Sequence, residues 1–468
     1  MQPISIEIKN YRSINTISLS IENLSDDTRT YGLIGVNEAG KSSVLKAIAL
    51  MGNDSIPNAK DFRNSDLPIS ISITYKLKVA ILNRGKMEPE ATHLEMEFLK
   101  SNASYDQIEV THLFEAATST KKITSLARAS DGAVKEMQIS EIPSTLLFSP
   151  IFWTAEEKYL ISRPIQLAQF AENPGHISIP LRNCFLLAGY SDIPNAIRSL
   201  HDSTDKEHLQ DILGEAVTNH INSVWPGHPI KITFSIDGDQ INFHVKDEGS
   251  NAKAKTADQR SDGFKQFVSF LLTVSAENKK EQLSNSILLV DEPETHLHPK
   301  AQQYFLNELK EITKVDRRNI VFFATHSTFM IDRNDLSRNF RVTKTADETA
   351  LERFDKNSAT YNKVNFEVFD IYSTDYHNEL YATLHAKHKK DFPENKNLWQ
   401  IKEFDVTFFH GKHGFEKNKP SKGCPNELTL SSYIRNCIHH SESGEIYTQE
   451  DLVASTLRMR NCLDTKVQ

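Results

Sequence analysis

The sequence predicts an α/β fold: a parallel sheet that carries the functional site, interrupted by a large α+β insertion and followed by a mainly helical C-terminal region. Two observations lead to this prediction. A strand at residues 31–34 runs into a glycine-rich loop and then into a helix at 43–51. Two apolar runs, 287–290 and 320–324, are typical of strands that are buried on both faces of a parallel sheet.

Length and composition limit the classes of protein to which this sequence can belong. At roughly 150 residues per domain, the 468 residues predict two to four structural units. No stretch approaches the roughly 18 consecutive apolar residues of a membrane helix, and the first residues alternate like a strand, so we expect a cytoplasmic protein with no membrane partner. The four cysteines contain no C-x-x-C pair, and a net charge of −8 argues against a uniformly basic nucleic-acid coat.

The glycine-rich loop, Gly35-Val-Asn-Glu-Ala-Gly-Lys-Ser42, matches G-x-x-x-x-G-K-[ST] and lies between a strand and a helix, as this phosphate-binding motif requires. Its glycines let backbone N–H groups turn toward phosphates, and the helix N-terminus adds positive potential. Lys41 is expected to reach the β- and γ-phosphates of ATP, and Ser42 to bind Mg²⁺. The expected ATP-binding residues of this Walker A motif are Gly35, Asn37, Glu38, Ala39, Gly40, Lys41, Ser42 and Ser43.

The apolar run at 287–290 ends in two carboxylates, Asp291 and Glu292, which would lie at the carboxyl edge of a central parallel strand. This is the arrangement of a Walker B strand. Asp291 is expected to hold Mg²⁺, directly or through water. Glu292 is expected to polarise the attacking water as a catalytic residue, because in-line phosphoryl transfer needs a positioned nucleophile.

Two further elements lie close to the Walker B strand in the sequence. Ser261 and Gly263 form a Ser-x-Gly pattern at a predicted helix start, and such a helix start can bind a γ-phosphate. The second apolar run, 320–324, leads to His326. We expect this histidine to contact the γ-phosphate or the attacking water.

These segments resemble the ABC-class ATPases, in particular the OLD-like and SMC-like branch found in prokaryotic defence systems. Lys41 and Asp291 are 250 positions apart, so a large insertion separates the two Walker motifs. The segments that carry the resemblance are Gly35–Ser42, Arg260-Ser-Asp-Gly263, Val290-Asp-Glu-Pro-Glu-Thr-His-Leu-His-Pro299 and Ala324-Thr-His-Ser327.

The resemblance implies that ATP is sandwiched between two heads, so that the protein pairs with itself or forms a larger assembly. Ser261 and Gly263 would then act across the interface, on the site that the Walker residues and His326 form in the other head. The resemblance also implies a nucleotide-sensing glutamine near residues 148–169, where more than one glutamine competes.

The motif positions divide the chain into four expected parts. These are the N-terminal lobe of the ATPase head (1–60), an inserted arm (61–225), the C-terminal lobe of the head (226–335) and an effector or coupling domain (336–468). Within the arm, alternating residues at 69–75 and 93–98 indicate strands, and apolar positions three and four residues apart indicate helices in its second half.

The C-terminal part departs from those OLD-like proteins that carry a metal-dependent nuclease, because no Asp-x-Asp triplet follows Asp332. Arg435 and His440 instead have the spacing R-x(4)-H within a predicted helix, which resembles the metal-independent site of HEPN ribonucleases. Histidine can transfer a proton near pH 7, and arginine can bind phosphate through two hydrogen bonds. A structural helix end or a subunit contact would explain the same spacing.

Three accounts of function are consistent with these motifs. Resemblance to the ATPases of PARIS and Septu systems implies a sensor of a phage protein or DNA that controls a separately encoded nuclease, and we favour this account. In the second account the C-terminal region is itself an RNase, directed at RNA such as tRNA. In the third the chain is a DNA-repair ATPase, because neither a fold nor a motif determines biological function.

Overall fold

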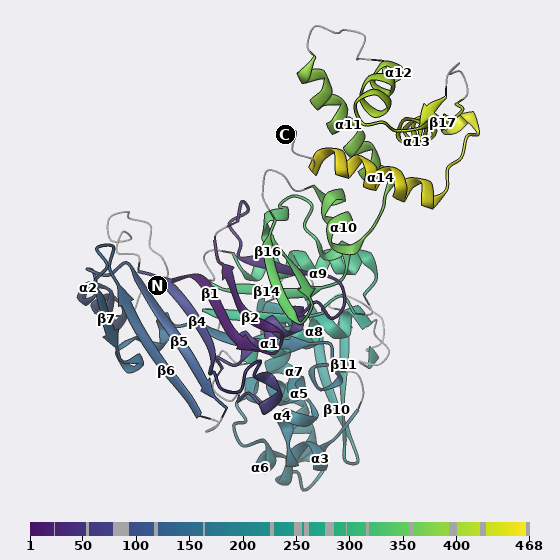
Figure 1. Cartoon of the computed structure of the whole chain (residues 1–468). Coiled ribbons are helices and arrows are strands. Elements are labelled where there is room, and N and C mark those ends of the chain that lie inside the picture. The colour runs from purple at the N-terminus through teal and green to yellow at the C-terminus, as the bar shows by residue number, and fades with distance from the viewer. Residues whose placement is uncertain are drawn as a thin grey trace. The chain divides into compact units, whose positions relative to one another are not determined.

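The computed structural model describes residues 1–22, 24–52, 56–77, 93–116, 120–161, 164–224, 229–247, 255–256, 262–276, 285–295, 297–314, 318–354, 360–392, 400–421 and 427–464. The chain forms two compact units, Met1–Lys356 and Asn357–Gln468 (Figure 1). The first unit contains all the Walker segments, and the second contains Arg435 and His440.

A six-stranded sheet forms the centre of the first unit. In spatial order its strands are β16 (Glu348–Arg353), β15 (Asn339–Thr345), β3 (Thr30–Ile34), β14 (Ile320–Thr325), β13 (Ser286–Asp291) and β8 (Ser149–Thr154). The strands from β15 to β8 run parallel, whereas β16 is antiparallel to β15. The predicted parallel sheet is confirmed, and the two apolar runs form the neighbouring strands β13 and β14.

The central strand β13 is buried on both faces of this sheet. Ile287 and Leu289 pack into one hydrophobic core, whereas Leu288 and Val290 pack into a second core on the opposite face. All of these side chains are inaccessible to solvent. Because burying each such side chain contributes about 1.5–3 kcal/mol, both faces of the strand require apolar residues, and the sequence shows a continuous apolar run.

An antiparallel sheet and helix α1 cover one face of the central sheet. The strands of this second sheet are, in order, β2 (Ile14–Ser20), β1 (Gln2–Tyr11), β4 (Ile69–Lys76), β5 (Gln107–Glu115), β6 (Thr120–Arg128) and β7 (Val134–Met137). Helix α1 (Lys41–Ala49) lies between the two sheets, because it contacts β1 on one side and β8, β13 and β14 on the other (Figure 1).

Helices and a small antiparallel sheet cover the opposite face. The small sheet consists of β10 (Ile230–Asp237) and β11 (Gln240–Asp247), with β9 (Ile165–Gln166) and β12 (Lys255–Thr256) paired to β11. The helices are α3 (Leu167–Glu172), α4 (Pro174–Ile177), α5 (Ile179–Leu187), α6 (Ile193–Arg198), α7 (Ser203–Val224), α8 (Asp262–Ala276) and α9 (Pro299–Ile312). Helix α7 packs on β10, and α8 packs on β8 and α5.

The described residues of 61–225 belong to the first compact unit. Strands β4–β7 continue the sheet of β1 and β2, and β8 enters the central sheet beside β13. Residues 93–98, which we expected to form a strand, are part of helix α2 (His93–Ser101). Glu95 and Phe98 are the buried residues of this helix, and their three-residue spacing is that of one helix face.

The second unit is mainly helical, as predicted. Its elements are α10 (Tyr361–Phe369), α11 (Thr374–Asp391), α12 (Ile401–Phe404), a π-helical segment (Asp405–Lys412), β17 (Lys417–Lys419), β18 (Leu428–Thr429), α13 (Leu430–His439) and α14 (Gln449–Asp464). Phe404, Phe408 and Phe409 form an aromatic core with side chains of α11 and α14.

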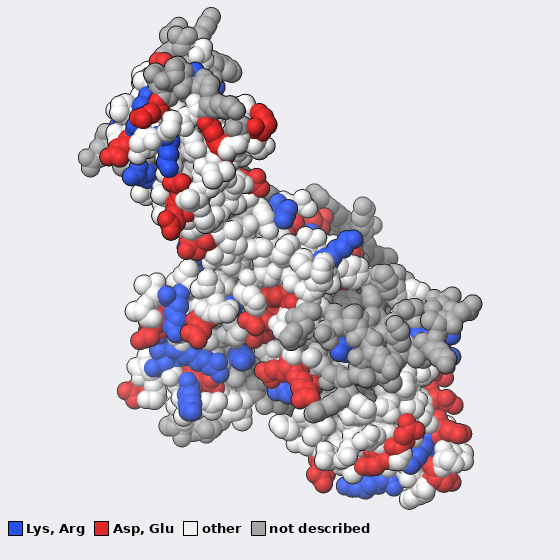
Figure 2. All heavy atoms as spheres, turned by 90° about the vertical axis from the view of Figure 1, so that its right-hand side faces the viewer, with Lys and Arg blue, Asp and Glu red and all other residues white. Residues whose placement is uncertain are grey.

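Charged side chains of both signs are interspersed over the described residues on the face that Figure 2 shows. This distribution agrees with the modest net charge of −8. Among the described residues, no helix combines the length and the apolar character that crossing a membrane requires.

Candidate nucleotide-binding site

The segments that follow β3, β13 and β14 meet at one edge of the central sheet. The strands are in register there, since Ile34 of β3 pairs with Thr325 of β14, and Ala324 pairs with Asp291 of β13. Parallel strands present their carboxyl ends at the same edge of a sheet. The Walker A loop, the two carboxylates and His326 therefore lie side by side, although they are far apart in the sequence.

Two glycines determine the shape of the Walker A loop. At Gly35 a Cβ atom would collide with the carbonyl oxygen of Val342 in β15. A larger residue would therefore force the loop away from β15. Gly40 has φ +105°, in the left-handed region that glycine favours, and a Cβ atom there would collide with Thr349 of β16. The hairpin formed by β15 and β16 thus packs directly against the loop.

The remaining loop residues differ in exposure. Asn37 and Glu38 are exposed at the tip of the loop, and Glu38 has φ +62°. Ala39 is buried, and its carbonyl oxygen accepts a hydrogen bond of 3.3 Å from Thr349 Oγ1. Ser43 is half-buried in the first turn of α1. The exposed tip leaves backbone groups of the loop open to a ligand.

Lys41 is the first residue of α1, and only 4% of its surface is exposed. Its Nζ donates hydrogen bonds of 2.9 Å to the carbonyl oxygens of Gly35 and Val36. Burial lowers the pKa of Lys41, and the carboxylates of Glu292, Glu294 and Asp291 oppose this shift. The ammonium group is therefore held within the loop, where the motif expects phosphates.

Ser42 and Asp291 join the two Walker motifs. Ser42 Oγ donates a hydrogen bond of 2.8 Å to Asp291 Oδ1, and Asp291 is only 7% exposed. Burial raises the pKa of Asp291, and the hydrogen bond from Ser42 opposes that shift. A hydroxyl and a carboxylate oxygen that converge in this way are the donor types that Mg²⁺ prefers, so these two residues fit a magnesium site.

Glu292 follows the Walker B strand in a left-handed conformation, with φ +49°. Its backbone N–H donates to the carbonyl oxygen of Ala324 at 3.0 Å, which ties it to the end of β14. Its side chain is 41% exposed, and Oε1 lies 3.7 Å from Nδ1 of His326. The side chains of Glu292 and His326 therefore lie together at the open edge of the sheet.

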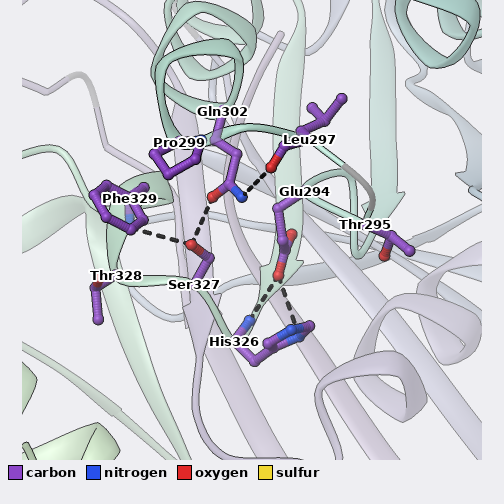
Figure 3. Close-up of a pocket in the computed structure, with 9 residues that line it drawn as sticks. All are labelled: Glu294, Thr295, Leu297, Pro299, Gln302, His326, Ser327, Thr328 and Phe329. Atoms are coloured by element: carbon purple, nitrogen blue, oxygen red, sulfur yellow. Dashed lines mark hydrogen bonds and ion pairs between the residues drawn. The ribbon is translucent and has the colours of Figure 1, made fainter. Parts of the chain in front are cut away.

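His326 lines a groove of about 540 Å³ beside these residues (Figure 3). The groove lies between the segment after the Walker B strand, the start of α9 and the segment after β14. Its lining residues are Glu294, Thr295, Leu297, Pro299, Gln302, His326, Ser327, Thr328 and Phe329. Glu294 is the residue of this set that is closest in sequence to the Walker B carboxylates.

The predicted Ser-x-Gly element is only partly within the described residues. Ser261 lies outside them, and Gly263 lies in the first turn of α8. Gln266 of the same helix is 1% exposed and donates a hydrogen bond to the carbonyl oxygen of Thr295. This bond joins α8 to the loop that follows Glu292.

Sequence motifs did not identify every residue at this edge. Thr349 contacts the Walker A loop, and its hydroxyl lies 2.8 Å from Ser13 Oγ. Thr154, the last residue of β8, pairs with Asp291. The glutamines in the range 148–169 are Gln166 of β9 and Gln169 of α3, after the end of β8. Strand pairing places Thr154 and Thr349 at this edge, and a local motif contains no signal for such pairing.

Arg435 and His440 lie in the second unit, on α13 and at its C-terminal cap. The His440 side chain is 59% exposed, and its Nδ1 lies 3.3 Å from Glu442 Oε1. Burial lowers the pKa of His439 between them, and the charges of Arg435 and His440 lower it further. The end of α13 therefore gathers three basic side chains.

Two family profiles match the chain. Residues 1–144 match the family described as "AAA ATPase domain", and residues 185–332 match the family described as "AAA domain, putative AbiEii toxin, Type IV TA system". An uncharacterized protein of Methanocaldococcus jannaschii is 26% identical over 114 residues, which are 23% of this chain and 29% of that protein. The chain thus matches less than a third of that relative's length.

Solved structures of SMC heads are distantly similar. The SMC head domain from Thermotoga maritima has 12% identity and a TM-score of 0.38, over 76% of this chain and 100% of that chain. A Pyrococcus furiosus Smc head with an extended coiled coil, bound to the C-terminal domain of ScpA, has 12% identity and a TM-score of 0.40, over 76% and 96%. The sheet-edge geometry and the two family profiles show that the first unit is a P-loop ATPase fold of mixed α/β type, which a mainly helical region follows.

Proposed function

We propose that this chain is an ATP-hydrolysing switch of the ABC class, of the OLD-like and SMC-like type, that acts in bacterial defence against phages. The main observation behind this proposal is the hydrogen bond of 2.8 Å between Ser42 and Asp291, which are 249 positions apart. It joins a Walker A hydroxyl to a Walker B carboxylate at the edge of a parallel sheet. The family description that names the AbiEii toxin supports the defence role.

The side chains divide the work of hydrolysis among them. Lys41 exchanges its carbonyl partners for the β- and γ-phosphates, which are stronger acceptors because they are charged. Ser42 and Asp291 would hold Mg²⁺, which would supply positive charge to neutralise the phosphate oxygens. Glu292 orients the attacking water, and His326 contacts that water or the γ-phosphate.

We further propose that two heads pair around ATP, with Ser261 and Gly263 of each chain completing the site of the other. A ligand shifts such an equilibrium by its difference in affinity for the two states. ATP makes contacts with both heads only in the paired state, so its affinity for the paired state is higher than for a single head. Hydrolysis then returns the pair to separate heads, which makes the assembly a switch.

ATP turnover tests this proposal directly. Glu292→Gln should retain ATP binding and lower turnover about a hundred- to a thousandfold, since losing one well-placed group raises a barrier by about 2.7–4 kcal/mol. Glu292 lies at the open edge and does not hold the Walker A loop, so binding should persist. Wild-type turnover in Glu292→Gln, or none in the wild-type chain, would refute the proposal.

The second unit is proposed to couple the ATPase to a separately encoded nuclease. A second candidate function is an RNase site of its own, and the observation that favours it is the gathering of Arg435, His439 and His440 at the end of α13. Incubation of the full chain with total RNA and ATP distinguishes the two. Cleavage that is lost in His440→Ala but kept in His439→Ala supports the RNase, because the spacing R-x(4)-H contains His440. Intact RNA supports the coupling role.

A further inference from the structure

Glu294 is a buried carboxylate beside the site that has no part in the hydrolysis described above. It follows Asp291 by three positions, and only 4% of its surface is exposed. Its Oε1 accepts hydrogen bonds from Thr325 Oγ1 at 2.6 Å and from the backbone nitrogen of His326 at 2.9 Å. Removing a carboxylate from water is costly even when it is hydrogen-bonded. The burial of a glutamate at this position therefore indicates a partner that a charged carboxylate binds better than a neutral acceptor does.

That interaction is with the ring of His326. Oε1 of Glu294 lies 3.3 Å from Nδ1 of His326, whereas Oε1 of Glu292 lies 3.7 Å from the same atom. The Glu294 side chain is 3% exposed, and that of Glu292 is 41% exposed. Figure 3 shows the Glu294 carboxylate directed at both the ring and the backbone nitrogen of His326. Glu294 is thus the buried and nearer partner of the ring, and Glu292 is the exposed one.

We propose that Glu294 is a positioning residue that keeps a proton on Nδ1 of His326 and so leaves Nε2 free to face the nucleotide or the attacking water. In a neutral imidazole one nitrogen carries the proton, and a hydrogen bond to that nitrogen selects the tautomer. A carboxylate that orients a histidine in this way lets the other ring nitrogen act on a reacting group. The catalytic consequence depends on the proposed hydrolysis, whereas the tautomer of His326 does not.

Gln302 supplies a matched control within the same groove. It is 8% exposed, accepts a hydrogen bond of 2.6 Å from Ser327 Oγ, and donates one of 2.9 Å to the carbonyl oxygen of Leu297. Like Glu294, it joins the segment after the Walker B strand to the segment after β14. Gln302→Leu therefore disturbs the groove through Ser327 and Leu297, and not through the imidazole of His326.

Steady-state kinetics of the full chain test the catalytic consequence. We expect kcat of Glu294→Ala to fall about ten- to a hundredfold, with KM for ATP little changed, because the hydrogen bonds of Glu294 go to the end of β14. Gln302→Leu should keep the wild-type kcat. A wild-type kcat in Glu294→Ala, or an equal loss in Gln302→Leu, would overturn the proposal.

Nuclear magnetic resonance of ¹⁵N-labelled histidine tests the tautomer directly. The His326 signals are identified by their loss in His326→Gln. We expect a proton on Nδ1 in the wild-type chain and loss of that preference in Glu294→Ala. An unchanged tautomer overturns the proposal.

If the wild-type chain proves not to hydrolyse ATP, the proposed function fails, but this measurement still decides the role of Glu294. If Glu294→Ala does not fold, Glu294→Gln permits both measurements, since it keeps an oxygen acceptor and removes the charge.

Discussion

Lys41 and Ser42 are neighbours in the sequence but have different partners in the structure. Lys41 donates to carbonyl oxygens of its own loop, whereas Ser42 donates to a carboxylate of another strand. A nucleotide would therefore compete with the loop for Lys41, and Mg²⁺ would insert where Ser42 meets Asp291.

Replacing Lys41 should abolish the stabilisation that ATP confers on the chain. Ligand at a hundredfold excess over its Kd stabilises a protein by about 2.7 kcal/mol, and Lys41→Ala removes the only ammonium group of the Walker A motif. Thermal unfolding with and without Mg–ATP measures the effect. Lys122→Ala, a change to an exposed lysine of β6, should keep the wild-type shift. An ATP-dependent shift that persists in Lys41→Ala would contradict the assigned role.

Helix α1 connects the phosphate-binding loop to both sheets, and Lys121 binds the turn that follows its C-terminal end. Lys121 of β6 places Nζ 2.9 Å from the carbonyl oxygen of Met51 and 2.6 Å from that of Gly52. The last carbonyls of a helix lack partners within the helix, and a cation there also interacts favourably with the helix dipole. The antiparallel sheet thus holds the helix on which the Walker A loop depends.

Removing this contact should destabilise the first unit. We expect Lys121→Ala to lower the free energy of unfolding by about 2 kcal/mol, the scale of a hydrogen bond to a charged group. Chemical denaturation followed by circular dichroism measures the change. The exposed neighbour Lys122 provides the control, and Lys122→Ala should remain close to wild type. Equal effects of the two substitutions would show that the helix end does not need the cation.

A group of charged residues joins the start of β3 to α9 and β15. Arg338 is fully buried and lies 2.7 Å from Asp26 and 3.1 Å from Asp332, while Lys310 lies 2.8 Å and 2.7 Å from the same two carboxylates. Burial alone would raise the pKa of Asp26, but hydrogen bonds from Lys310 and Thr28 and the charge of Arg338 lower it overall.

The lowered pKa of Asp26 predicts a pH-dependent contribution to stability. A carboxyl whose folded pKa is depressed stabilises the fold above its unfolded pKa of about 3.9, and the contribution is lost as the pH falls through the folded pKa. Asp26→Asn should therefore lower stability by about 1 kcal/mol at pH 7, since the side chain is 32% exposed, and the difference from wild type should shrink below about pH 4. Unfolding curves from pH 3 to 7 test this. Asp27→Asn, at an exposed neighbour, should show no such trend.

The whole chain consists of two compact units. In the first, residues from both ends of the unit reach one sheet edge, because the central sheet is assembled from strands between residues 30 and 353. The second unit has its own cores and carries Arg435 and His440.

Pairing predicts a change in mass with nucleotide. Glu292→Gln with Mg–ATP should elute as a dimer or a larger assembly in size-exclusion chromatography with light scattering, because ATP stays bound between the heads. Adding Ser261→Arg should return the protein to the mass seen without ATP, since a bulky charged residue would obstruct the contact across the interface. A mass that is indifferent to ATP in Glu292→Gln would rule out nucleotide-driven pairing.

The parallel sheet and the helical C-terminal region could be predicted because their signals are local. The continuous apolar run of β13 reflects burial on both faces, and the Walker A loop combines its glycines with Lys41 within eight residues. The position of residues 61–225 in the fold could not be predicted in this way. Whether β4 continues the sheet of β1, and whether residues 93–98 form a strand or a helix, depends on partners far away in the sequence.

The sequence alone therefore predicted which residues bind a nucleotide, because the spacing of a glycine loop, a lysine and a hydroxyl is a property of one short segment. Only the tertiary structure decided which other side chains join them. Thr349 and Thr154 reach the site through strand pairing, and Glu294 reaches His326 through the packing of two loops. Such contacts are settled by burial and hydrogen bonding between distant segments, which no local pattern encodes.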